Sequence, residues 1–379
     1  MIDFKQIPPA CYVLEESKLV KNLELMRYVQ EQSGAQIICA LKGFAMFSTF
    51  PIVRQYLPGS TASSLNEALL GLEEFGGEVH LCAPAYNPQD FQELLRCCDH
   101  ITFNTLTQWE QFKAQVQVSP KKVSCAIRIN PEYSEVENDL YNPCVAGTRL
   151  GITADKFGEK LPDGIEGLHF HTLCENNSDT LERTLAHVEQ KFGHLLHQAK
   201  WLNMGGGHHI TRSDYDVERL IRLIKHLRQT YDLAIYLEPG EAVGWQTGFL
   251  AAEVLDILDS RGVKVAVLNV SFTAHMPDCL EMPYKPRIRN AQDPLPQDKY
   301  VYRMGGMSCL AGDQMGDYAF EKPLSVGDRI IFEDMIHYTM VKTTTFNGVN
   351  LPSIGIIKPD NSFQLVKSFG YQDYRNRLS

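Results

Sequence analysis

Three short stretches of the sequence carry side chains whose types could act together on one bound molecule. Lys42 lies in the apolar run ICALKGFA, where burial would lower the pKa of its amine and make it a nucleophile toward an aldehyde. The glycines at 205–207 follow another apolar run and can offer clustered backbone N–H groups to a phosphate. Glu238, in the sequence EPG, supplies a carboxylate that can keep a pyridine nitrogen protonated, and an imidazole such as His171 can stack on that ring.

Each of these residues also has an ordinary structural explanation. Lys42 could extend from a strand end into solvent, and a histidine on a strand is more often a core residue than a catalyst. A triple glycine is commonly a tight turn, and EPG is a common strand–turn ending in which Glu238 could simply cap the strand. His169 and His171 share one face of a strand and could bind a metal, but no third ligand with diagnostic spacing accompanies them. We therefore predict no metal site. Lys42, the glycines, His171 and Glu238 indicate a function only when they are taken together.

Alternating helical and strand patterns between about residues 17 and 240 would place these stretches at strand ends. Short apolar runs, most of them separated by helical patterns, indicate eight strands: 36–41, a weak run at 60–62, 78–82, 101–103, 123–129, 165–173, 201–204 and 233–238. Eight βα units within about 220 residues favour an α/β fold of the closed (β/α)8 barrel type. Functional groups of such barrels lie at the carboxyl ends of the strands, where the candidate residues would converge.

The sequence after Gly248 has a different pattern. Apolar segments broken by Gly, Pro, Asp and Asn, with few convincing helices, indicate strands at 249–259, 263–272, 299–306, 328–335 and 349–357. The extended segment 10–15 precedes the barrel and could join the same sheet. We therefore expect a barrel over residues 15–247 and a mostly β domain made of residues 1–14 and 248–379.

Composition narrows the class of protein. Hydrophobic residues make up 44% and charged residues 22% of the chain, as in a soluble globular enzyme, and no apolar run has the length of a membrane span. The amino terminus lacks the features of a signal peptide, and the ten cysteines show no CxxC motif, which together predict free thiols and a cytoplasmic location. A net charge of −10 argues against a nucleic-acid partner.

The combination of motifs resembles the fold-type III enzymes that use pyridoxal 5′-phosphate (PLP), the group of alanine racemase and the ornithine and diaminopimelate decarboxylases. The resemblance is carried in the family's order by ALKGF, RINP, GLHFH, GGG, EPG and GGMSCLAGD, and it spans nearly the whole chain. The longer motifs SSLNE, GLHFHTLCE, LNMGGGHHI, EPGEA and NVSFTAHMPDCLEMPY are similar to the branch of carboxynorspermidine (carboxyspermidine) decarboxylases.

The resemblance implies a PLP site. Lys42 would hold the cofactor covalently, His171 would stack on its ring, and Glu238 would pair with its pyridinium nitrogen. The remaining cofactor contacts, mainly to the phosphate, would come from Gly205, Gly206, Gly207, Gly240 and Tyr338. In place of the arginine that many relatives have after EPG, this chain has Glu241, so any positive group near the phosphate must come from elsewhere.

Cys309 matches a cysteine that the family's decarboxylases donate across a dimer interface, where it helps to protonate the carbanion left by CO2 loss. The resemblance therefore implies an obligate homodimer with shared active sites, although a free cysteine is more often a small buried hydrophobe. The acidic residue that usually follows this cysteine is replaced by Leu310, which argues against ornithine or diaminopimelate as substrate. Asp278, Glu281 and Asp313 are candidates to bind the amines of a longer polyamine.

The expected reaction is α-decarboxylation of carboxynorspermidine, carboxyspermidine or both to norspermidine or spermidine and CO2, in polyamine biosynthesis. Lys42, His171 and Cys309 would be the catalytic residues. The alternatives are an amino-acid racemase or another fold-type III decarboxylase with the same cofactor, and a non-catalytic PLP-binding protein. Carriers of that last kind are usually single barrels, so the second domain with Cys309 argues against it.

Overall fold

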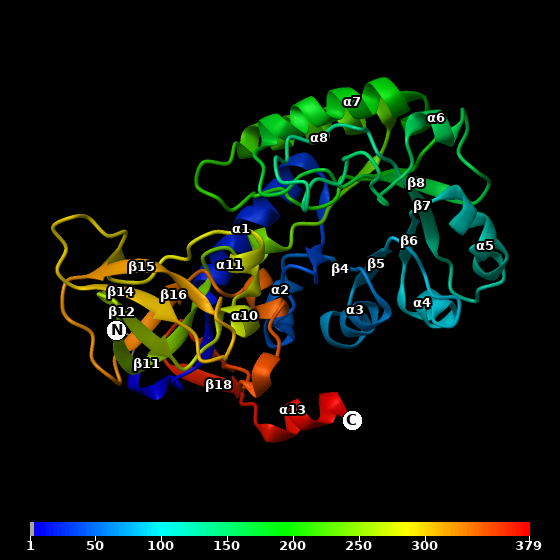
Figure 1. Ribbon diagram of the computed structural model, residues 1–379. Coiled ribbons are helices and arrows are strands. Elements are labelled where there is room, and N and C mark those ends of the chain that lie inside the picture. Colours follow the sequence, from blue (N-terminus) through cyan, green and yellow to red (C-terminus); the bar gives the residue numbers. More distant parts are fainter. Residues whose placement is uncertain (1–3) are drawn as a thin grey trace. The chain divides into compact units, whose positions relative to one another are not determined.

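The computed structural model describes residues 4–379 and divides the chain into two units. The barrel unit comprises Lys21–Val243, and the β unit comprises the segment that ends at Val20 together with Gly244–Ser379. In Figure 1 most of the barrel unit is coloured blue to green and most of the β unit yellow to red. Both divisions lie within six residues of those expected from the sequence, where the barrel was placed at 15–247.

All eight strands expected in the barrel are present, and they run parallel. Their bounds are β2 (Gln36–Ile37), β3 (Cys39–Ala40), β4 (Gly59–Ala62), β5 (Glu78–Cys82), β6 (His100–Phe103), β7 (Ser124–Arg128), β8 (Ile165–His169), β9 (Trp201–Asn203) and β10 (Ala234–Leu237). The first expected strand is divided into β2 and β3 by Ile38 alone. Because β2 pairs with β10 and β3 pairs with β4, the sheet closes on itself and the predicted (β/α)8 barrel is confirmed.

Helices alternate with these strands as the periodicity predicted. Their bounds are α1 (Glu16–Ser33), α2 (Phe50–Val53), α3 (Leu65–Leu70), α4 (Phe91–Cys97), α5 (Leu106–Gln117), α6 (Ala154–Phe157), α7 (Ser178–Leu196), α8 (Val217–Tyr231) and α9 (Glu241–Gly244), with short turns η2 (Phe47–Thr49) and η3 (Gly71–Phe75). Ser64 caps α3 by accepting a hydrogen bond from the Glu67 N–H at 3.3 Å. The Glu67 carboxylate accepts a hydrogen bond at 2.7 Å from the N–H of Ser63, the residue before the cap, so the contact differs by one residue from a standard capping box.

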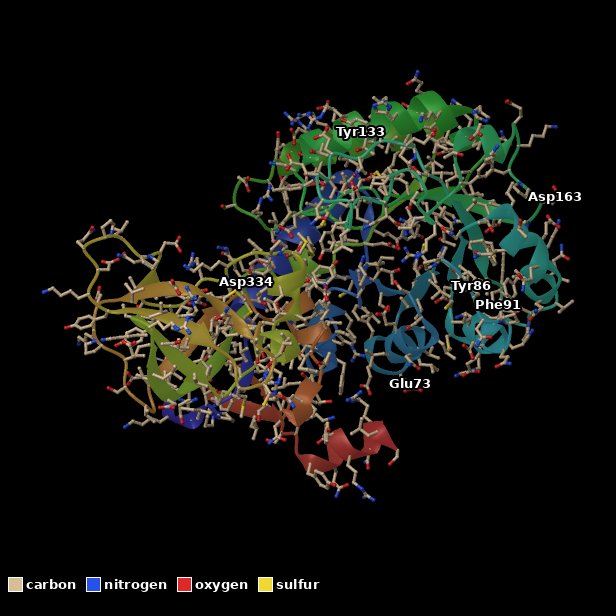
Figure 2. All side chains as sticks on the ribbon, in the orientation of Figure 1. Glu73, Tyr86, Phe91, Tyr133, Asp163 and Asp334 are labelled. Carbon is tan, nitrogen blue, oxygen red and sulfur yellow. The ribbon has the colours of Figure 1, made fainter. Side chains whose placement is uncertain are left out.

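Aromatic side chains fix two of the helices against the barrel wall. The rings of Phe91 on α4 and Phe112 on α5 stack with their centroids 4.0 Å apart, and both lie next to Phe103 of β6. Tyr86 packs on the same group, 5.9 Å from Phe91, and Figure 2 labels these two side chains next to each other. Burial of these rings supplies much of the apolar contact that holds helices to strands in this part of the barrel.

The β unit is built around a mixed sheet. Its strands are β1 (Cys11–Glu15), β11 (Gly248–Ser260), β12 (Val263–Leu268), β13 (Ala291–Gln292), β14 (Val301–Gly305), β15 (Gln314–Phe320), β16 (Arg329–Glu333), β17 (Ser353–Ile357) and β18 (Phe363–Lys367). Its helical segments are η1 (Phe4–Gln6), α10 (Phe272–His275), α11 (Pro277–Glu281), α12 (Tyr338–Val341), η4 (Phe346–Gly348) and α13 (Tyr371–Leu378). Strand β1 pairs with β11 and with β17, which confirms that segment 10–15 joins this sheet. Within residues 4–379 no helix is both long and apolar enough to cross a bilayer.

Candidate active site

Lys42 is delivered by a tight turn that follows β3. The N–H of Gly43 donates to the carbonyl of Ala40 at 3.0 Å, which closes the turn. A Cβ atom on Gly43 would lie 2.8 Å from the backbone nitrogen of Glu241, and one on Gly240 would lie 3.0 Å from the Cα of Gly43. Both positions therefore require glycine, because the Lys42 turn and the EPG turn touch through their backbones.

The amine of Lys42 has the electrostatic setting expected of a reactive lysine. Burial among the surrounding barrel atoms lowers its pKa, and the guanidinium of Arg128 lowers it further, while the carboxylate of Glu238 acts in the opposite direction. The side chain nevertheless remains accessible to solvent. Because its pKa is lowered, the Lys42 amine loses its proton more readily than an ordinary surface lysine and so adopts the neutral, nucleophilic form more readily.

Glu238 follows β10 and is held as a carboxylate inside the barrel. It is only 8% exposed, its Oε1 accepts a hydrogen bond from Asn203 Nδ2 at 2.8 Å, and its Oε2 lies 3.3 Å from His169 Nε2. Burial alone would raise its pKa, but the hydrogen bond and charge of His169 outweigh burial and lower the pKa to about 2. Glu238 is therefore ionised at neutral pH and able to pair with a protonated ring nitrogen.

His169, considered from the sequence only as a metal ligand, lies against the Glu238 carboxylate. Burial would lower its pKa, but Cys82, whose Sγ lies 4.0 Å from His169 Nδ1, and Glu238 on the other side raise it to about 9. The imidazole is thus cationic at neutral pH and fixes the charge of Glu238. No local sequence signal marks this pairing, because it depends on sheet register: His169 and Asn203, which both contact Glu238, occupy one register position on adjacent β8 and β9.

His171 and the triple glycine form one packed group. The N–H of Gly206 donates to His171 Nδ1 at 2.8 Å, and burial together with the charge of Lys42 lowers the pKa of His171 well below its ordinary value. Its ring is therefore neutral, with the proton on Nε2. Gly205 and Gly207 have φ angles of 67° and 81°, and a Cβ on Gly207 would lie 2.1 Å from the Leu173 carbonyl oxygen. These glycines are needed for backbone packing, and their contact with a phosphate stays a prediction.

The candidate residues expected from the second domain all belong to the β unit. Cys309 is in the loop between β14 and β15, where its N–H donates to Asn347 Oδ1 at 2.6 Å. All ten cysteines fall within the described residues, and Cys309 is the exposed one among them, so it is not a buried hydrophobe. Its thiol is therefore accessible to a reacting group.

Asp313 orders the loop that carries Cys309. Its carboxylate accepts backbone hydrogen bonds from Phe272 at 2.7 Å, Thr273 at 3.1 Å and Ser308 at 3.0 Å. A Cβ on Gly306 would lie 2.4 Å from the Asp313 carboxyl carbon, which requires glycine there. The expected substrate-binding role of Asp313 stays a prediction, and this structural role is an addition to it.

Asp278 and Glu281 are brought together by a lysine of the same unit. Lys342 Nζ lies 2.7 Å from Asp278 Oδ1 and 2.5 Å from Glu281 Oε2, and it also lies 5.8 Å from the ring centroid of Tyr338. Two of the candidate substrate acids and the predicted phosphate-contacting tyrosine therefore form one cluster around Lys342.

The residues of the barrel unit match the functional groups of PLP. Lys42 offers an amine of lowered pKa to its aldehyde, Glu238 an ionised carboxylate to its ring nitrogen, and His171 the face of a neutral imidazole to its ring. Each of these groups is supplied from the end of a different barrel strand. This donor set fits the chemistry of PLP, and the role of each residue toward the cofactor stays a prediction.

Comparisons with known proteins identify the family of the chain. The profile of a family described as "Pyridoxal-dependent decarboxylase, C-terminal sheet domain" matches residues 11–336. Carboxyaminopropylagmatine decarboxylase from Synechocystis sp. is 51% identical over 98% of this chain and 96% of its own. Carboxynorspermidine/carboxyspermidine decarboxylase from Campylobacter jejuni is 44% identical, with 99% of each chain covered.

Solved structures of decarboxylases also match this chain over nearly its whole length. The crystal structure of carboxynorspermidine decarboxylase from Campylobacter jejuni in complex with norspermidine matches with a TM-score of 0.91, covering 98% of this chain and 100% of that chain at 44% identity. Diaminopimelate decarboxylase from Helicobacter pylori shares the fold, with a TM-score of 0.81 at 15% identity over 99% of this chain and 98% of its own. The chain therefore belongs to the pyridoxal-dependent decarboxylase family, in the group that includes the carboxynorspermidine/carboxyspermidine decarboxylases.

Proposed function

We propose that this decarboxylase removes the α-carboxylate of carboxynorspermidine, carboxyspermidine or both, releasing CO2 and norspermidine or spermidine. The observation that carries the proposal is that the chain has both a Lys42 amine of lowered pKa and an ionised Glu238. The chain is also 44% identical, over 99% of its length, to the Campylobacter jejuni carboxynorspermidine/carboxyspermidine decarboxylase. The reaction would be a step of polyamine biosynthesis.

Bound PLP supplies an electron sink for the electron pair that remains after CO2 is lost. Lys42 would hold the cofactor covalently until the substrate amine replaces it. Glu238, kept anionic by His169, would keep the proton on the ring nitrogen, and His171 would supply a neutral imidazole beside the ring. Gly205, Gly206, Gly207, Gly240 and Tyr338 are proposed to complete the cofactor site, mainly around the phosphate.

The protein is proposed to act as a homodimer in which Cys309 of one copy serves the active site of the other and protonates the product carbon. Large apolar side chains around the Cys309 loop are exposed, with Met307 at 44%, Leu310 at 49% and Phe346 at 48%. The hydrogen bond between Cys309 and Asn347 places Phe346 next to this loop. A grouped set of exposed apolar residues is typical of a surface that another chain covers, and the second copy is the occupant that brings Cys309 to a site.

The distal amines of the substrate are proposed to bind carboxylates of the β unit. Asp278 and Glu281 already neutralise one ammonium group, that of Lys342, so a substrate amine can compete for the same oxygens. Asp313 is the third proposed acid, with most of its hydrogen-bonding capacity directed at backbone N–H groups. The ten free cysteines support a cytoplasmic location for this chemistry.

A second candidate substrate is carboxyaminopropylagmatine, whose distal end is a guanidinium instead of an amine. The observation that favours it is the 51% identity to the Synechocystis decarboxylase named for that compound, against 44% for the Campylobacter enzyme. Carboxyaminopropylagmatine and the carboxylated polyamines share the end that loses CO2. They differ in the distal group, a guanidinium or an amine, that the proposed substrate-binding acids must bind.

The experiment compares three substrates with one purified protein. PLP-loaded protein is given carboxynorspermidine, carboxyspermidine or carboxyaminopropylagmatine, and kcat/KM is measured from CO2 release, with diaminopimelate and ornithine as controls. We expect CO2 from at least one carboxylated polyamine and little from the controls. A preference for the guanidinium compound would select the second candidate, and CO2 from none of the three would refute both.

A further inference from the structure

A cluster of metal-ligating side chains lies at the end of the barrel opposite to Lys42. Glu78 and His80 are two residues apart on β5 and so share one face of that strand, and His100 begins the neighbouring β6. His80 and His100 occupy the same register position of the two strands. Because Glu78 and His100 start their strands whereas Lys42 follows the end of β3, the cluster is at the amino-terminal end of the parallel sheet.

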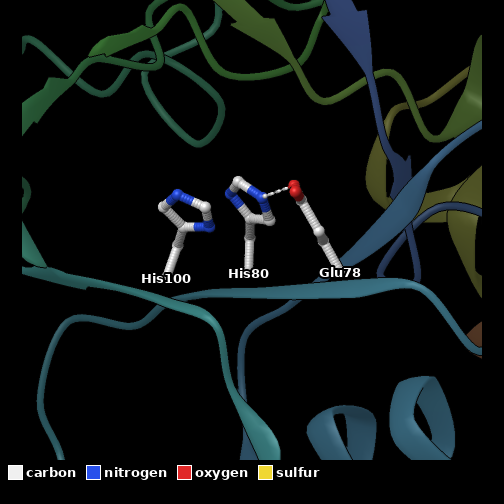
Figure 3. A group of neighbouring side chains, drawn as sticks. All are labelled: Glu78, His80 and His100. Atoms are coloured by element: carbon white, nitrogen blue, oxygen red, sulfur yellow. Dashed lines mark hydrogen bonds and ion pairs between the residues drawn. The ribbon is translucent and has the colours of Figure 1, made fainter. Parts of the chain in front are cut away.

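The three side chains approach one another closely. His80 Nε2 lies 3.3 Å from Glu78 Oε2, and the rings of His80 and His100 stack with centroids 4.0 Å apart and planes inclined by 18°. Figure 3 shows the two rings face to face, with the Glu78 carboxylate directed at His80 from the other side. One ligand atom from each residue lies within 4.8 Å of the others.

The surroundings of the cluster are those of a site with one open side. His80 is only 2% exposed, and the rings of Trp201 and Tyr236 enclose the histidines, at 5.1 Å from His100 and 4.7 Å from His80 respectively. Within residues 4–379 the buried Nδ1 of His100 has no hydrogen-bond partner, which is a cost that a ligand would remove. The Glu78 side chain is 41% exposed, so solvent and ions reach the cluster from its side.

We propose that Glu78, His80 and His100 bind a divalent transition metal ion such as Zn²⁺. Two histidines and one carboxylate are a known zinc ligand set, and water can occupy the fourth position on the exposed side of Glu78. Zinc–ligand bonds of about 2.0–2.1 Å place tetrahedral ligands roughly 3.3 Å apart. Because the three ligand atoms lie within 4.8 Å of one another, no pair of them has to close by more than about 1.5 Å. Parallel rings cannot both direct a lone pair at one ion, and binding therefore opens the stack by rotating an imidazole about its Cβ–Cγ bond.

The position of the site decides what the metal would do. The amino-terminal end of a (β/α)8 barrel serves stability, whereas reactions take place at the carboxyl ends of the strands. An ion bound to β5 and β6 would tie two adjacent strands together and would favour the folded state by mass action. We therefore expect metal to raise the thermal midpoint of unfolding without changing kcat.

The test uses PLP-loaded protein dialysed against Co²⁺, a spectroscopic substitute for Zn²⁺. We expect one bound ion per chain, visible ligand-field absorption without a thiolate charge-transfer band, and quenching of Trp201 fluorescence. Glu78→Gln and His100→Gln should each weaken binding by at least about tenfold. His226→Gln is the matched control, because His226 also pairs with a glutamate, Glu189, at 3.0 Å, and it should bind like the wild type.

Several results would overturn the proposal. Binding that is unchanged in both Glu78→Gln and His100→Gln would do so, as would a failure of the wild type to retain one ion. A thiolate band would assign the ion to cysteine, and loss of binding in His209→Gln would assign it to the group of Glu175, His209 and Glu241 instead. If His100→Gln does not fold, the half-exposed Glu78 variant gives the answer alone.

Discussion

Replacing His169 with glutamine tests whether the charge of one buried histidine keeps Glu238 ionised. The pKa of Glu238 is lowered from 4.5 to about 2, a difference of about 2.5 pH units that corresponds to about 3 kcal/mol in favour of the carboxylate. Burial is the largest influence on Glu238 and acts to raise its pKa. Glutamine can still donate a hydrogen bond but carries no charge, so the pKa of Glu238 should rise above its ordinary value.

The expected consequence is a weaker hold on the protonated ring nitrogen. We predict that kcat/KM of His169→Gln falls by about 10- to 100-fold near about pH 6 and by less near about pH 8, because acid neutralises Glu238 first. PLP affinity, measured by absorbance titration of the apoprotein, should fall in parallel. The matched control is His194→Gln, whose exposed imidazole lies 3.9 Å from the Glu159 carboxylate. Wild-type kcat/KM and an unshifted acid limb in His169→Gln would show that the charge of His169 does not hold Glu238 ionised.

The pairing of His169 with Cys82, and secondarily with Glu238, also makes stability depend on pH. The raised pKa of His169 gives a contribution that is complete below pH 6.5 and lost as pH rises through about 9, so the wild-type melting temperature should fall over that range more than that of His169→Gln. Lys42→Ala should lose the visible absorbance of bound cofactor and at least about 100-fold in kcat, whereas unchanged absorbance would contradict its assignment. Gly43→Ala should destabilise the fold by about 1–3 kcal/mol in urea unfolding, because its Cβ would lie 2.8 Å from a backbone nitrogen, and Gly312→Ala, with no atom within 4 Å, should change little.

The barrel was predictable because its signals are local. Each strand is an apolar run between helical patterns, and even the weak run at 60–62 forms β4, whose four residues are all buried. Its small residues are explained by close packing, since a Cβ on Gly59 would lie 2.3 Å from the Glu78 carbonyl oxygen. The sequence analysis did not predict β13, β15, β18 or the short helices of the β unit, because brief elements with mixed polarity have no clear period.

The site was predictable where a residue type at a strand end suffices, as for Lys42 and Glu238. It was not predictable where function depends on pairing between strands. The partnership of His169 with Cys82 and the stacking of His80 on His100 join residues that are 87 and 20 positions apart, and only the register of the folded sheet brings them together.

The hydrogen bonds that order the Cys309 loop could not be predicted from the sequence either. The anchoring role of Asp313 depends on hydrogen bonds to backbone groups about 40 residues earlier in the chain, at Phe272 and Thr273. No spacing rule predicts such contacts, because they arise from how β14 and β15 return beside α10.

Running the reaction in D2O and analysing the product by mass spectrometry shows whether this protein is an α-decarboxylase. For each norspermidine or spermidine formed we predict one CO2 and one deuterium at the carbon that carried the carboxylate, with neither in the Lys42→Ala variant. Recovery of the carboxylated substrate with deuterium exchanged at its α carbon, and without CO2, would instead identify a racemase and rule out α-decarboxylation.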